Sequence, residues 1–190
     1  MEVSSIFKQN GEQVLVIIGN GTYEKKLLHA LAPKFNGIRA SLVITSLPIS
    51  KKTGLAALEG LASILTRGYY VEKALFIIDK EHINDFNDIK SRLGEYGFMI
   101  EEYKELTQKV ALFDLSRGIN KVKLYAVITG DVKCINEEIA KLASQVYGKE
   151  VKPRNVKHIK IKELLSKATL EAIKKSLEGL AFVLQYIEKN

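Results

Sequence analysis

The chain has 190 residues, of which 46% are hydrophobic and 27% charged, and its formal net charge is +7. Such a chain suits one domain with a sizeable core, and it lacks any run near the roughly 18 apolar residues of a membrane helix, which excludes a membrane span. Cys134 is the only cysteine, which excludes an intrachain disulfide and a zinc site built from cysteines. Residues 1–12 are polar and lack the apolar core of a signal peptide, so we expect a cytoplasmic protein.

The charge is unevenly distributed along the chain. Residues 76–110 hold five basic and eight acidic side chains, whereas residues 149–190 hold ten basic and five acidic ones. A basic end beside an acidic centre can bring a polyanion to a metal site, because contacts to phosphate dominate nucleic-acid affinity. A solvated, lysine-rich surface is the alternative. Abundant Lys, Glu and Ile without any Trp is typical of proteins from thermophiles.

The first half of the chain predicts strands that alternate with helices. Short apolar runs rich in β-branched side chains are typical of buried strands, and stretches with apolar residues at helical spacing follow them. This alternation predicts a mostly parallel sheet with right-handed crossovers. The predicted strands lie at residues 14–18, 39–45 and 74–78, and the predicted helices at residues 23–32, 54–66 and 84–96.

The pattern changes after Gly97, where three strand-like segments follow one another with no helix between them. The last two predict an antiparallel hairpin. A helix, a polar segment with Pro153 and one long final helix complete the chain. The predicted strands are residues 98–103, 110–115 and 122–128, with the hairpin turn at 116–120, and the predicted helices are residues 136–147 and 162–187.

The clearest linker is residues 148–154. The sequence therefore predicts an α/β core domain over residues 1–148, followed over residues 149–190 by a basic segment and the C-terminal helix. Apolar residues in that helix repeat at alternating steps of three and four, as in a coiled coil. Two interpretations stay open, because this helix either packs on its own domain or forms the contact of a homodimer.

The most informative stretch is residues 73–82, in which Asp79 and Glu81 follow a buried strand. Ligands of open α/β sheets bind at the carboxyl ends of strands. Two carboxylates one residue apart on an extended strand point the same way and can hold a divalent cation such as Mg²⁺. The candidate catalytic acids beside them are Glu24, in a first helical turn, and Asp114, inside an apolar strand. The alternative is that Asp79 caps the next turn and Glu81 is solvated.

Two segments are candidates for binding phosphate. The turn after the first strand can aim backbone N–H groups at a phosphate at the start of a helix, although the third glycine of a dinucleotide-binding fingerprint is replaced by Glu24. A plain tight turn is the alternative. Residues 151–162 form the second segment, with five basic residues and no acidic one. The phosphate-binding candidates are Gly19, Asn20, Gly21 and Thr22 in the turn, and Lys157, Lys160 and Lys162 in the basic segment.

The order of elements, with Ile77-Ile78-Asp79-Lys80-Glu81 ending the third strand, resembles the Toprim domain of primases, topoisomerases and OLD-type nucleases. The resemblance covers residues 13–105. That family carries Asp-x-Asp at this place, filled here as Asp-x-Glu, and a Glu-Gly pair ending its first strand, where this chain has Gly19-Asn20. The resemblance implies that Glu24 substitutes for the family's glutamate as general acid or base, or that catalysis has been lost.

We therefore expect a three-layer, Rossmann-like or Toprim-like α/β protein whose mostly parallel sheet has some antiparallel strands in its second half. The expected function is divalent-metal-dependent phosphoryl transfer on nucleic acid, with Mg²⁺ as cofactor and no membrane partner. The alternative is a non-catalytic Rossmann-like module that binds nucleic acid or a nucleotide, or that senses a small phosphorylated ligand.

Overall fold

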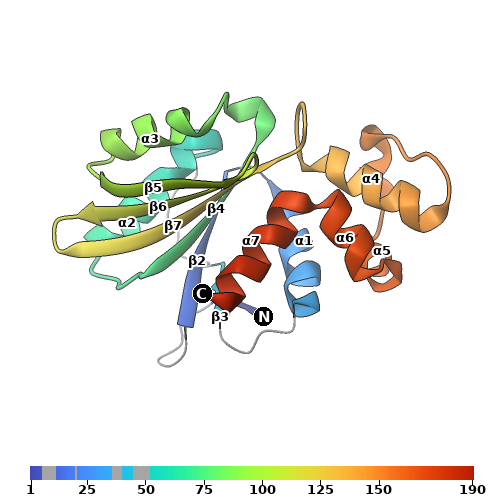
Figure 1. The fold of residues 1–190 in the computed structure, drawn as a ribbon, viewed down its shortest axis with the longest axis horizontal. Helices are drawn as coiled ribbons and strands as arrows, with labels where there is room; N and C mark the ends of the chain where they lie inside the picture. The colour runs from blue at the N-terminus through green and yellow to red at the C-terminus, as the bar shows by residue number, and fades with distance from the viewer. Residues whose placement is uncertain (6–11, 20, 36–39, 45–51) are drawn as a thin grey trace.

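The computed structural model describes residues 1–5, 12–19, 21–35, 40–44 and 52–190. The described residues form one seven-stranded sheet with helices on both faces, so the predicted three-layer α/β fold is confirmed (Figure 1). Five neighbouring strands pair in parallel, and the last two pairings are antiparallel. In sheet order the strands are β1 (Glu2–Ser4), β3 (Ala40–Val43), β2 (Glu12–Ile18), β4 (Lys73–Asp79), β7 (Asn120–Thr129), β6 (Val110–Arg117) and β5 (Met99–Thr107).

Strand β4 lies at the centre of the sheet, between β2 and β7. Residues 74–78 are all fully buried, because successive side chains point to opposite faces and both faces are covered. Leu75 and Ile77 join the apolar core on one face, whereas Phe76 and Ile78 join the core on the other. The predicted buried central strand is therefore confirmed, and so is the hairpin of β6 and β7.

The helices divide between the two faces according to their apolar stripes. The larger core contains side chains from α1, α4, α5, α6 and α7, and the smaller core contains side chains from η2, α2 and α3. The helices are α1 (Thr22–Leu31), α2 (Glu59–Thr66), α3 (Phe86–Glu95), α4 (Ile135–Tyr147), α5 (Ile161–Lys167), α6 (Leu170–Ser176) and α7 (Glu178–Lys189), and the short 3₁₀ helices are η1 (Ala32–Lys34), η2 (Gly54–Leu58), η3 (Lys80–His82) and η4 (Pro153–His158).

The connections that follow β2 and β3 cross opposite faces of the sheet. Helix α1 carries the chain from β2 to β3 across one face, and α2 carries it back across the other face to β4, on the far side of β2. The carboxyl ends of β2 and β4 thus form the topological switch point of the sheet. Open α/β sheets bind ligands at such points.

The long helix predicted for residues 162–187 is wrong, because the structure divides this segment into α5, α6 and α7. The backbone is extended at Ala168, and Thr169 caps α6 by accepting a hydrogen bond from the N–H of Ala172. Leu177 then has φ −111° and ψ 48°, which separates α6 from α7. Short breaks of this kind leave the three-and-four spacing of apolar residues intact, so the sequence pattern does not reveal them.

The apolar seam of the C-terminal helices is buried inside the chain itself. All seam residues of α6 and α7 except Leu170, which is 44% exposed, lie in the larger core, together with side chains of α1, α4 and the sheet. The seam therefore packs on its own domain, and a seam of this spacing suits packing on a sheet as well as packing on a second helix. Its most buried members are Ile173, Leu177, Leu180, Leu184 and Ile187. The homodimer contact stays a prediction. Among the described residues, no helix has the length and apolar character needed to cross a bilayer.

Candidate functional site

Two buried acidic side chains meet at the carboxyl ends of β2 and β4. Asp79 is the last residue of β4, and Glu24 lies in the first turn of α1, directly after β2. Their carboxyl groups lie within electrostatic interaction range of each other, and each residue is only 3% exposed. Burial penalises the charged form of a carboxyl, so acids are rarely this buried without a partner. The structure thus brings together two of the acids that the sequence predicts as members of one site.

The contact with Asp79 changes the protonation of Glu24. Burial, followed by the charge and hydrogen bond of Asp79, raises the pKa of Glu24 to about 7, although a hydrogen bond from its own backbone N–H opposes the rise. Two carboxylates held close together repel each other, which favours the protonated form of Glu24. Glu24 therefore exchanges a proton near neutral pH.

Asp79 is held in place from the other side by the next strand and helix. Its Oδ1 accepts a hydrogen bond of 2.7 Å from the Thr129 hydroxyl and one of 3.0 Å from the backbone N–H of Ile135. Thr129 ends β7 and is fully buried, and Ile135 is the first residue of α4, where the helix dipole favours a negative charge. Thr129 carries no local sequence signal for this contact, because the pairing of β4 with β7 joins segments fifty residues apart.

The loop between β7 and α4, residues 130–134, is fixed by a buried ion pair. The Oε1 of Glu138, a residue 1% exposed, accepts hydrogen bonds from Lys109 Nζ at 2.7 Å and from the Gly130 N–H at 3.1 Å. Lys109 also contacts Asp131 at 2.7 Å. Glu137 accepts hydrogen bonds from the N–H groups of residues 131, 132 and 133. These bonds hold the loop in place. The loop links Thr129 to Ile135, which both donate hydrogen bonds to Asp79.

Glycine at position 19 allows the end of β2 to lie close to β4 and η2. A Cβ on Gly19 would lie 3.1 Å from both the Gly54 carbonyl oxygen in η2 and the Ile77 carbonyl oxygen in β4, so these neighbours would have to shift to admit a side chain. Gly21 precedes α1 with φ 69°, a value that favours glycine. Asn20 and the side chain of Thr22 lie outside the described part of the structure. The Glu24 carboxyl accepts a hydrogen bond from its own backbone N–H in the first turn of α1. Phosphate binding at this helix start stays a prediction.

The sequence predicts that Glu81 continues the strand beside Asp79. In the structure β4 ends at Asp79, and Glu81 lies in η3 instead. The Glu81 carboxylate lies 3.8 Å from Lys133 Nζ and 3.8 Å from His82 Nε2, and its side chain is 32% exposed. Within the described ranges, no group of three or more His, Cys, Asp or Glu side chains is placed to hold a metal ion. Glu81 as a metal ligand therefore stays a prediction.

Asp114 lies at the opposite end of the sheet. On β6 it faces Lys123 of β7, which in turn faces Lys73, the first residue of β4. Six residues of strand separate Lys73 from Asp79, which is about 20 Å. Asp114 instead lies 3.9 Å from Lys123 Nζ, which compensates its charge. The structure thus does not bring Asp114 to the Glu24–Asp79 pair.

The three candidate lysines lie on the exposed surface near the far end of α4. Lys157 belongs to η4, Lys160 precedes α5 and Lys162 lies in its first turn. Lys160 contacts Glu163 at 3.5 Å, as an exposed ion pair. Helix α4 begins beside Asp79 and has 13 residues, so its other end is about 18 Å away. The lysines therefore do not touch the Glu24–Asp79 pair.

No family model, characterised protein or solved structure matches the chain. The function must therefore be inferred from the residues themselves.

The Glu24–Asp79 pair has the donor chemistry of a Mg²⁺ site. Mg²⁺ prefers carboxylate oxygens and is commonly held by one or two carboxylates together with waters and substrate phosphates. A cation between two neighbouring carboxylates removes the repulsion between their charges. Asp79, with Glu24 beside it, fits such an ion, whereas the described residues bring no third carboxylate to the pair.

Proposed function

We propose that the protein carries out divalent-metal-dependent phosphoryl transfer on nucleic acid, with Asp79 and Glu24 at its centre. The observation that carries this proposal is the contact between these two buried carboxyl groups at the switch point of the sheet. Burying two acids against each other costs stability, and costly arrangements of ionisable groups are typical of functional sites. The net charge of +7 supports a polyanionic substrate.

The positions of the two acids suggest different roles. Asp79 is the cation ligand, since Thr129 and the start of α4 fix the orientation of its carboxylate. Glu24, whose pKa is about 7, can take a proton from an attacking water or hydroxyl and return it to the leaving group. A bound Mg²⁺ would neutralise charge on the phosphodiester and make water or a hydroxyl a better nucleophile.

Calorimetric titration with Mg²⁺ and Mn²⁺ tests the cation site. The titration is run with and without a phosphorothioate oligonucleotide, because Mg²⁺ often needs substrate oxygens to complete its shell. We expect the wild-type protein to bind metal and Asp79→Asn to bind it at least about tenfold more weakly, a loss of about 1.4 kcal/mol. Asp114→Asn is the matched control, since it removes a carboxylate at the other end of the sheet.

Cleavage or ligation of labelled single-stranded DNA and RNA tests the reaction itself. With Mg²⁺ or Mn²⁺ present, we expect activity in the wild type and in Asp114→Asn, and its loss in Asp79→Asn and Glu24→Gln. Metal binding that is undiminished in Asp79→Asn, or activity that persists in EDTA, would refute the proposed function.

A non-catalytic nucleic-acid-binding module is the second candidate, and specific observations favour it. Glu24 and Asp79 are each 3% exposed, and Asp79 Oδ1 already accepts two hydrogen bonds. Glu81 lies near Lys133 and His82 instead of the pair. In this case the pair is a structural contact. Binding would then weaken with salt and with combined Lys157→Glu, Lys160→Glu and Lys162→Glu substitutions, and EDTA would not change it.

A further inference from the structure

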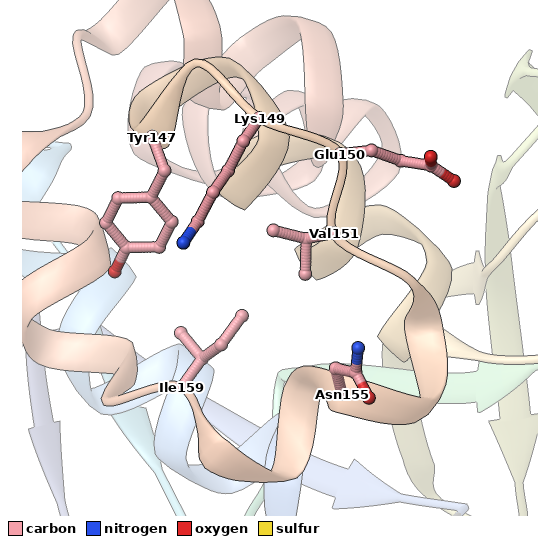
Figure 2. A pocket seen from close by; sticks show the side chains of 6 residues that line it. All are labelled: Tyr147, Lys149, Glu150, Val151, Asn155 and Ile159. Atoms are coloured by element: carbon pink, nitrogen blue, oxygen red, sulfur yellow. The ribbon is translucent and has the colours of Figure 1, made fainter.

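An open pocket of about 650 Å³ lies at the far end of α4 from Asp79. In Figure 2, Tyr147 and Lys149 reach into it from one side, and Val151 and Ile159 point toward its middle from opposite sides. Glu150 is directed away from the opening. The pocket shares no residue with the Glu24–Asp79 site. Its lining residues are Tyr147, Lys149, Glu150, Val151, Asn155 and Ile159.

The rim of the pocket is built by a defined reversal of the chain. Helix α4 ends at Tyr147, and Gly148 follows with φ 64° and ψ 22°, a left-handed conformation suited to glycine. The N–H of Val151 then donates a 2.9 Å hydrogen bond to Ser144 Oγ on α4. Val156 of η4 is fully buried in the larger core. These contacts hold the rim in place, so the pocket exists before any ligand binds.

The lining combines an aromatic ring, an apolar slot and polar groups at the edge. Tyr147 is 37% exposed, and Val151 and Ile159 are half-buried. The exposed Asn155 carries an amide that both donates and accepts hydrogen bonds. Residues 149–162 around the opening contain six Lys or Arg and a single acidic residue, Glu150, whose side chain is turned away. Aromatic rings within a basic surface are typical of sites that bind single-stranded nucleic acid.

We propose that this pocket holds one base of a single-stranded nucleic acid. The base stacks on the Tyr147 ring between Val151 and Ile159, Asn155 faces its hydrogen-bonding edge, and Lys149 lies near the phosphate. The volume lies within the usual range of small-molecule sites. A duplex does not fit this chemistry. Each base in a duplex is stacked on its neighbours and paired along its hydrogen-bonding edge, so neither the ring face nor this edge is available to the protein.

Single-stranded nucleic acid would then be the substrate class of the proposed function. The pocket rests on that function only for the link between the two sites. About 18 Å of α4 separates the pocket from Asp79. At the 3.4 Å per nucleotide of a stacked strand, this distance is about five nucleotides. A strand of eight nucleotides is therefore long enough to reach both sites, whereas a mononucleotide reaches one.

Fluorescence anisotropy with a labelled octanucleotide, in EDTA and at low salt, tests the pocket. We expect Tyr147→Ala to raise the Kd by about 5- to 100-fold, which is the usual contribution of one stacked base. Tyr147→Phe keeps the ring and should bind within about twofold of the wild type. Tyr70→Ala is the matched control, because Tyr70 is 75% exposed and lies in the loop before β4. Asn155→Ala, at an exposed position, tests the same pocket should Tyr147→Ala fail to fold.

Unchanged octanucleotide affinity in Tyr147→Ala and Asn155→Ala would overturn the proposal. Equal affinity for mononucleotides and for the octanucleotide would overturn the strand as ligand and leave a nucleotide site. The two proposals fail separately, since strand binding in EDTA does not involve metal. In EDTA, Asp79→Asn should keep full octanucleotide affinity, although it loses metal binding. Tyr147→Ala should lose octanucleotide affinity and keep metal binding.

Discussion

Glu24 illustrates how one side chain depends on its position in the fold. In the first turn of a surface helix it would be an ordinary solvated acid, but α1 begins at the switch point and carries Glu24 against Asp79. The resulting pKa of about 7 lies well above the ordinary value of 4.5. A carboxyl whose pKa is raised by folding stabilises the folded state below its unfolded pKa, and this stabilisation is lost as pH rises through the folded value.

The first prediction concerns stability and pH in the absence of metal. In EDTA, we expect the contribution of Glu24 to the free energy of unfolding to fall between pH 5 and pH 8, by about 3 kcal/mol at most. Glu24→Gln mimics the protonated acid and should remove this part of the pH dependence. Urea denaturation at several pH values measures it.

The exposed Glu171 on α6 offers the matched control, because Glu171→Gln should keep the wild-type pH dependence. Identical slopes for Glu24→Gln and the wild type would show that Glu24 is not the group that titrates.

Single residues also show which parts of the site could be read from the sequence. Asp79 could be placed because it directly follows a recognisable buried strand, and Glu24 because it follows another. Asp114 could not, since its position depends on the register of β6 on β7 and of β7 on β4. Thr129 was missed for the same reason. Local pattern locates a residue along its own strand, but only the order and register of the strands bring two residues together.

At the scale of elements, the loop of residues 130–134 decides how Asp79 is held. It joins Thr129 at the end of β7 to the first N–H of α4, and both groups donate to the same carboxylate oxygen. Gly130 lies at its start with φ 81°, and a Cβ there would come within 2.6–2.7 Å of backbone atoms of Cys134. The loop can therefore keep its conformation only with glycine at this position.

The second prediction compares two glycines, Gly118 and Gly130, that both have a positive φ angle. Gly118 in the β6–β7 turn has φ 60°, with open space where a Cβ would lie. We expect Gly118→Ala to lower the free energy of unfolding by about 1–2 kcal/mol, which is the cost of the left-handed conformation. Gly130→Ala should cost about 3 kcal/mol or more, because the clash adds to that conformational cost. Chemical denaturation of both variants gives the difference, and equal losses would contradict the close packing of the loop.

The sequence predicts where most helices and strands lie, but it does not predict where a helical segment is interrupted. Strands β2 to β7 and the first four helices could be predicted from apolar periodicity, because each has one or two faces that must be covered, whereas the three-residue strand β1 was not predicted. The division of the last segment into α5, α6 and α7 could not, because the apolar stripe continues across Ala168 and Leu177 toward the same core. Periodicity reports which face is buried, and it does not report whether the backbone is continuous.

At the scale of the whole molecule, residues 149–190 close the larger core over the sheet. Helix α7 passes so near β7 that a Cβ on Gly179 would lie 3.1 Å from Val127 Cγ1. Leu180, Leu184 and Ile187 on the same helix are buried at 1% exposure or less. The C-terminal helices thus belong to the layer that α1 begins, and the sheet face beneath them would be exposed without them.

The third prediction concerns this packing and the oligomeric state. We expect Leu184→Ala to lower the free energy of unfolding by about 2–5 kcal/mol, as for a buried leucine, and Leu170→Ala by less than about 0.5 kcal/mol. Leu170 is 44% exposed and is the matched control. Sedimentation equilibrium should give the same mass, 21.3 kDa, for the wild type and both variants. A doubled mass that Leu184→Ala halves would restore the seam as a contact between two chains.

The outer strand β5 bears on how the protein behaves at high concentration. It is the last strand on its side of the sheet, and it carries Glu101, Glu102, Lys104 and Glu105. Its register with β6 is irregular at two places. A strand from a neighbouring molecule would have to strip water from these charges and follow an uneven ladder. We therefore expect this margin to resist edge-to-edge aggregation, so that concentrated solutions stay clear.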